Sequence, residues 1–222
     1  MRLRKQWISL ALAGALLALW MTPVSAGAGT AAQQDHHAHR ICYTQSMVDL
    51  NKELRRLWAE HVYWTRTYIV SATEGLADKD TVLQRLLRNQ QELGNAIKPY
   101  YGDKAGDKLA ELLREHIVIA GKITAAAMAG NQAEVEKLNK EWYRNGDDIV
   151  KFLSGANPNL AYNDLKTMFD RHLQLVTAAL TTRLKKDWNG DVLAFDEGIA
   201  HIMKFADILT AGIISQFPQK FK

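Results

Sequence analysis

The chain has 222 residues, one cysteine and a formal net charge of +4, from 28 basic and 24 acidic residues. The single Cys42 excludes an intramolecular disulfide framework. Arg2, Arg4 and Lys5 lie in a segment that we expect to be removed, so the charge of the remainder is near +1. The rest of the sequence has no basic run with interleaved aromatic residues, and nucleic acid is therefore not an expected partner.

The first 26 residues have the pattern of a secretory signal peptide. The basic residues at the start precede an apolar run from Trp7 to Trp20, and small residues suited to a signal peptidase follow at 24–26. As a helix this run would be about 21 Å long, which is shorter than a bilayer core. We therefore expect a Sec-exported protein, periplasmic or extracellular. After cleavage we expect no membrane contact, because no other stretch is expected to be long and apolar enough to span a bilayer.

Residues 27–43 are predicted to be a disordered tail. The tail contains His36, His37 and His39, and closely spaced imidazoles can chelate zinc, copper or nickel. We interpret this cluster as a weak and promiscuous metal binder without a specific role, and Cys42 as a free thiol.

From residue 44 onward the hydrophobic pattern is that of helices. Apolar residues recur every three or four positions in six segments, which are separated by breaks rich in Gly, Asn, Asp or Pro. Asn131 and Glu134 have the spacing of a helix N-cap and its partner. Sustained alternation typical of strands is missing from the sequence. We predict a single all-α domain over 44–222, a bundle of about six helices arranged as three antiparallel hairpin repeats, at about 44–98, 103–155 and 160–217.

One histidine recurs in the first helix of each predicted hairpin. His61, His116 and His172 are separated by 55 and 56 residues, which suits a repeat made of one helical hairpin. Each lies within an otherwise apolar helical stripe. A buried imidazole at the same place in three repeats needs a structural or chemical cause.

The second helices of the hairpins also align with one another, and each copy ends in a carboxylate followed by an aliphatic residue. The aligned segments are 88–93, 144–149 and, more loosely, 204–208. In an antiparallel hairpin, a residue 31 to 35 positions after the histidine returns to about its level. We therefore expect the three histidines to pair, in chain order, with Glu92, Asp148 and Asp207.

Three interpretations of these pairs remain open. In the first, the histidines and acids converge into one site of an exported binding protein, which holds a transition metal ion (Zn, Fe or Cu) or a small ligand. In the second, the pairs only satisfy buried polar groups in a structural or protein-interaction bundle. In the third, a metal with an open coordination position makes the protein an enzyme. His201 fits a half-exposed helix face, with a fourth metal ligand as the alternative.

Known catalytic patterns are missing from the sequence. No Glu-x-x-His motif accompanies the repeat histidines, so the di-iron carboxylate pattern is not matched. The chain also lacks a Gly-rich phosphate loop, a Gly-x-Ser-x-Gly elbow and a Cys–His couple. We therefore predict no catalytic residue, and a non-enzymatic protein is favoured.

Several short motifs resemble those of an uncharacterised, all-helical bacterial family. The likeness runs from about Leu54 to Phe221 and is carried by the segments 60–66, 85–89, 101–102, 115–116, 142–145, 157–158 and 212–218. Members often carry enzyme names, such as glycosyltransferase or acetylglutamate kinase, that this sequence does not justify. The resemblance implies the helical fold and supplies no activity. Gln90 and Gln91 depart from the family, which usually has Pro and Asp there.

Overall fold

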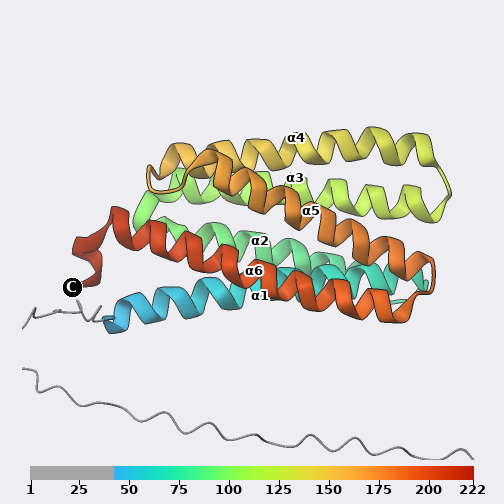
Figure 1. The fold of residues 1–222 in the computed structure, drawn as a ribbon, viewed down its shortest axis with the longest axis horizontal. Helices are drawn as coiled ribbons and strands as arrows, with labels where there is room; N and C mark the ends of the chain where they lie inside the picture. The colour runs from blue at the N-terminus through green and yellow to red at the C-terminus, as the bar shows by residue number, and fades with distance from the viewer. Residues whose placement is uncertain (1–42) are drawn as a thin grey trace, which may run out of the picture. The chain divides into compact units, whose positions relative to one another are not determined.

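The computed structural model describes residues 43–222, and the predicted signal peptide, the histidine-containing tail and Cys42 lie outside this range. Six long helices and one short 3-10 helix make up the fold (Figure 1). Their bounds are α1 Gln45–Thr73, α2 Lys79–Tyr101, α3 Asp103–Met128, α4 Gln132–Ala156, α5 Tyr162–Leu184, α6 Trp188–Gln216 and η1 Pro218–Phe221. Residues 43–222 contain no strand, so the all-α prediction is confirmed.

The helices form three antiparallel hairpins, α1–α2, α3–α4 and α5–α6, as the sequence predicted. Each helix packs against the next one in the chain, and α6 returns to pack against α1, so the six helices close into a ring. The turns within the three hairpins all lie at one end of the bundle, as Figure 1 shows at its right. Hence α1, α3 and α5 run in the same direction and bring their equivalent residues to the same level.

Local signals in the sequence set several helix ends. The side chain of Asn131 accepts a hydrogen bond from the backbone N–H of Glu134 (3.2 Å), which confirms the expected cap of α4. Helix α2 extends past Pro99 to Tyr101, three residues beyond the expected end of the first hairpin. It ends at Gly102, whose φ of 82° is in the region that favours glycine.

Buried polar side chains join the hairpins at the end where α2 meets α3. Asn157 is fully buried and donates to the hydroxyl of Tyr101 (2.8 Å), which in turn donates to the side chain of Gln216 (3.0 Å). The amide of Gln216 donates to the carbonyl of Ala156 (3.0 Å). These contacts link α2, the α4–α5 turn and α6, and they close this end of the bundle.

Helix α6 is long and apolar enough to cross a membrane by length and composition, although the sequence was expected to contain no such stretch after the signal. In the bundle it packs between α1 and α5. A core helix of a soluble protein passes the same test, so this property alone does not indicate a membrane span.

Candidate functional site

The three repeat histidines come together at the centre of the bundle. The ring centroid of His172 lies 5.7 Å from that of His61 and 5.8 Å from that of His116. Their exposed fractions are 3% for His61, 1% for His116 and 7% for His172. Parallel α1, α3 and α5 each supply one ring, so the imidazoles converge as the first of the three interpretations requires, whereas the acids do not join them.

Each histidine has a polar neighbour on the second helix of its hairpin, and this neighbour is an amide or another imidazole. Asn89 donates to the carbonyl of Leu57 (3.0 Å), and Asn145 donates to the carbonyl of Leu112 (3.2 Å). These carbonyls belong to residues four positions before His61 and His116. In the third hairpin, Nε2 of His201 lies 2.8 Å from the carbonyl of Met168, four positions before His172.

The three hairpins therefore share one internal register. Asn89 follows its histidine by 28 residues, while Asn145 and His201 follow theirs by 29. His201 occupies the third amide position, although the sequence alignment placed segment 204–208 there. The expected half-exposed position of His201 is confirmed, but its role in the hairpin was missed. The equal spacing of 29 residues would have indicated this role.

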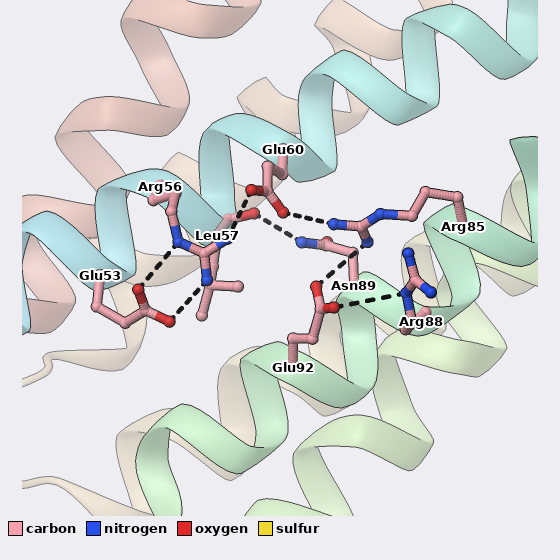
Figure 2. A network of polar contacts seen from close by, with 8 residues as sticks. All are labelled: Glu53, Arg56, Leu57, Glu60, Arg85, Arg88, Asn89 and Glu92. Carbon is pink, nitrogen blue, oxygen red and sulfur yellow. Dashed lines mark hydrogen bonds and ion pairs between the residues drawn. The ribbon is translucent and has the colours of Figure 1, made fainter.

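The expected pair of His61 and Glu92 is wrong. Figure 2 shows that Glu92 points toward the arginines of α2, whereas Asn89 reaches across to α1. One carboxylate oxygen of Glu92 lies 3.2 Å from Arg85 and the other lies 3.6 Å from Arg88. Arg85 also binds Glu60 of α1 (2.7 Å), so this network joins the two helices on the outside of the bundle.

The other two expected His–acid pairs are also wrong. Asp148 binds Arg144 of its own helix at 3.1 Å. Asp207 accepts a hydrogen bond from Asn51 (2.9 Å) and is ion-paired with Arg55 (3.2 Å). Both carboxylates are partly exposed, at 37% and 46% of their side-chain surface. A buried carboxylate would need a cationic partner, whereas a neutral amide can be buried at lower cost.

The hydrogen bonds of Asn145 define the tautomer of His116. Because the amide nitrogen of Asn145 donates to the carbonyl of Leu112, its oxygen faces the imidazole, with Oδ1 3.1 Å from Nδ1 of His116. An amide oxygen only accepts, so Nδ1 of the imidazole carries the proton. In the neutral ring, Nε2 is then an acceptor, and it has no hydrogen-bond partner among residues 43–222.

The histidines are surrounded by aromatic rings that keep them uncharged. Trp142 stacks on His116 with centroids 5.1 Å apart, and Trp58 lies edge-on to His61 at 5.7 Å. Burial lowers the pKa of His61 to about 4, against a smaller opposing effect of Asn89. Burial and the neighbouring His61 lower the pKa of His116 to about 3, although its bond to Asn145 opposes this. The pKa of His172 is also far below its usual value, because of burial and the three neighbouring histidines.

A cavity of about 490 Å³ extends from the histidines toward the turns within the hairpins. It is bounded by α1, α3, α4 and α5, with one residue from α2. In Figure 1, α4 and α5 lie close together near their connecting turn and diverge toward the opposite end, where the cavity is found. The volume falls within the range typical of small-molecule sites, roughly 300–1,000 Å³.

The cavity is mainly apolar along its length. Its aliphatic lining includes Ile117, Ile123, Val176, Leu180 and Leu184. The three imidazoles form a polar inner end. Glu136 and Lys185 are the charged side chains along the cavity within residues 43–222, and both are exposed. An apolar volume with a few polar groups at one end is typical of a binding site for a small organic molecule.

A second buried polar group lies where α1, α5 and α6 meet. The side chain of Asp191 is 3% exposed and binds Arg66 (2.7 Å) and Arg183 (3.2 Å). Arg183 also pairs with Glu74 (3.0 Å). This network crosslinks three helices, and its charges are matched within the protein, which indicates a structural role.

The six residues predicted to bind metal do not form one set of ligands. The three histidines are clustered, but the three acids face the outside of the bundle. Among the described residues, no group of three or more His, Cys, Asp or Glu side chains has an arrangement that could hold a metal ion. Comparison of the chain with protein-family models, curated proteins and solved structures gives no match, so the resemblance noted above stays a prediction.

Proposed function

We propose that this chain is an exported binding protein whose cavity holds a small, mainly apolar organic molecule. The observation that carries the proposal is the 490 Å³ cavity, which begins at a buried cluster of neutral imidazoles. An engineered cavity of about 150 Å³ can bind benzene, so this volume suits a molecule roughly three times as large. Export rests on the sequence pattern of residues 1–26 alone.

The extent of the cavity supports a ligand more than a packing defect. Protein interiors are close-packed, and most voids are little larger than a water molecule. Another hollow in this bundle, lined by Leu54 and Ile213 among others, is about 30 Å³. The large cavity is confined to one half of the bundle, next to the three histidines that the hairpins place at equivalent positions.

A fluorescence titration tests this proposal. The uncharged apolar dye N-phenyl-1-naphthylamine is added to protein purified after expression of the full chain, with the N-terminus read by mass spectrometry. Ala120 lines the cavity, so Ala120→Leu should weaken dye binding at least about tenfold, by filling space that the dye needs. Ala133 is exposed on α4 outside the cavity, and Ala133→Leu is the matched control.

We expect saturable binding of one dye per chain in the parent and in Ala133→Leu. Absence of saturable binding, or equal affinity in all three proteins, contradicts the proposal. A purely structural role for the histidines would then account for the cluster.

A transition metal ion (Zn, Fe or Cu) is a second candidate ligand. The observation that favours it is the orientation of His116, since metal-bound histidines usually donate their other N–H to a fixed protein acceptor. The rings would have to turn to share one ion. Metal analysis of untagged protein carrying His36→Ala, His37→Ala and His39→Ala tests this candidate. One equivalent of bound metal that is lost in His172→Ala supports it. Substoichiometric metal that His172→Ala leaves unchanged contradicts it. A metal-dependent enzyme, the third interpretation, also requires that one equivalent of metal binds at His172.

A further inference from the structure

The inner end of the cavity is lined by a histidine whose acceptor nitrogen has no hydrogen-bond partner among residues 43–222. Nε2 of His116 lies on the part of the ring away from Asn145 and has no partner in the described part of the chain. His116 is 1% exposed and lines the cavity, but its Nε2 is itself buried, so a ligand donor reaches this atom only when the neighbouring rings move aside. A buried acceptor without a partner costs about 1–3 kcal/mol, so a ligand that supplies a donor there gains affinity.

This acceptor is held in place by a chain of contacts. The carbonyl of Leu112 orients the amide of Asn145, and the amide orients the imidazole. On the outer side, the indole N–H of Trp142 donates to the backbone carbonyl of His116 (3.2 Å) while its ring stacks on the imidazole. The ring therefore cannot exchange its two nitrogens without breaking these contacts.

A charged group of a ligand would find no side chain of opposite charge at the inner end of the cavity. No Asp, Glu, Lys or Arg from the described chain lines the inner end, and the cavity's Glu136 and Lys185 lie toward the solvent. A ligand carboxylate would face the lone pair of Nε2 without a cation nearby. A ligand ammonium would lose its water without gaining a carboxylate.

We propose that the cavity selects uncharged, mainly apolar molecules that carry one O–H or N–H donor, and that this donor binds Nε2 of His116. Alcohols and phenols with an aliphatic or aromatic body have this chemistry. The selection rests on the proposed binding function, and it adds the class of ligand and the atom that recognises it.

Competition between three matched probes tests this selection. Each of 1-decanol, 1-methoxydecane and decanoate displaces bound N-phenyl-1-naphthylamine at pH 7.5. The three share an alkyl chain and differ in the head group, which is a donor, an acceptor without a donor, or an anion. We expect 1-decanol to bind about tenfold more tightly than 1-methoxydecane, as one satisfied buried acceptor allows, with decanoate the weakest.

Each outcome separates this inference from the function beneath it. If the dye itself does not bind, the binding function fails. If the dye binds but 1-decanol and 1-methoxydecane compete equally, or if decanoate competes best, only the selection by His116 is overturned. In a folded His116→Leu variant, the preference for 1-decanol over the ether should fall to about onefold, and an unchanged preference would also overturn it.

Should His116→Leu not fold, the nitrogen spectrum of the parent protein supplies the second readout. Addition of 1-decanol should shift the resonance of Nε2 of His116 and leave Nδ1 protonated. A shift confined to other residues would contradict the assignment of this atom.

Discussion

Oδ1 of Asn145 lies 3.1 Å from Nδ1 of His116, and this one contact determines which nitrogen of the imidazole carries the proton and which is left as an acceptor. Asn145 is fully buried and comes from the neighbouring helix of the same hairpin. Asn89 makes the equivalent backbone contact in the first hairpin, beside His61. The repeated element of this bundle is thus a polar side chain on the second helix that contacts the backbone carbonyl four residues before the histidine.

Replacement of Asn145 should destabilise the protein. Asn145→Leu removes the acceptor of a buried N–H of His116, and an unsatisfied buried group costs about 1–3 kcal/mol. Denaturant unfolding measures the loss. Asn95 is exposed on α2, and Asn95→Leu should change the free energy of unfolding by less than about 0.5 kcal/mol. Equal effects of the two substitutions would show that the contact with His116 does not contribute to the free energy of unfolding.

The free energy of unfolding should fall as the pH drops from 7 to 5. In the unfolded chain a histidine has a pKa near 6.5, whereas burial lowers it to about 4 in His61 and about 3 in His116. Below pH 6.5 the unfolded state binds more protons than the folded state, so each buried histidine removes about 2 kcal/mol by pH 5. Chemical denaturation across this range measures the slope.

A histidine variant provides the control for this pH dependence. His116→Gln should reduce the slope by about one third if the three rings contribute equally. A parent protein whose stability is constant between pH 7 and 5 would mean that the imidazoles are hydrated or charged in the folded state.

Loss of the charge on Asp191 should weaken the junction of α1, α5 and α6. Asp191→Asn leaves Arg66 and Arg183 without their shared partner, and we expect a cost of about 2–3 kcal/mol, below that of a fully buried pair because both arginines reach solvent. Asp196 is exposed on the same helix, and Asp196→Asn should have little effect. Thermal unfolding of the two variants compares them directly, and similar losses would assign the network no structural role.

Helices α2 and α3 approach so closely at Gly94 that a side chain does not fit. A Cβ at Gly94 would lie 2.4 Å from the carbonyl oxygen of Gly106, so the backbones would have to separate. We expect Gly94→Ala to cost at least about 2 kcal/mol. Gly155 lies in α4 with nothing within 4 Å of its Cβ position, and Gly155→Ala should stabilise by up to about 1 kcal/mol. A neutral Gly94→Ala in denaturant unfolding would refute the close approach.

The helices and the central histidines could be predicted from the sequence because both depend on local periodicity. Apolar spacing of three and four residues defines the buried stripe of a helix, and the equal positions of His61, His116 and His172 in three repeats place them at one level. The helix cap at Asn131 follows from short-range spacing in the same way.

The partners of the histidines were mispredicted because a hairpin returns several residues to nearly the same level. Asn89 and Glu92 are less than one turn apart on α2, yet one faces α1 and the other faces the arginines (Figure 2). Only the rotation of the helix decides between them. In the third repeat, the imidazole of His201 replaces the asparagine. Because the residue types differ, the sequence did not align His201 with Asn89 and Asn145. The cavity is lined by residues from helices that are far apart in the sequence, and no local pattern encodes such an arrangement.

The most direct test of the site is a long-range proton–nitrogen spectrum of the histidines in labelled protein, recorded while 1-decanol is added. The structure predicts that His116 carries its proton on Nδ1 before and after the addition, and that the resonance of its unprotonated Nε2 moves as the alcohol binds. A proton on Nε2 in the free protein, or saturating alcohol that leaves this resonance in place, would contradict the account.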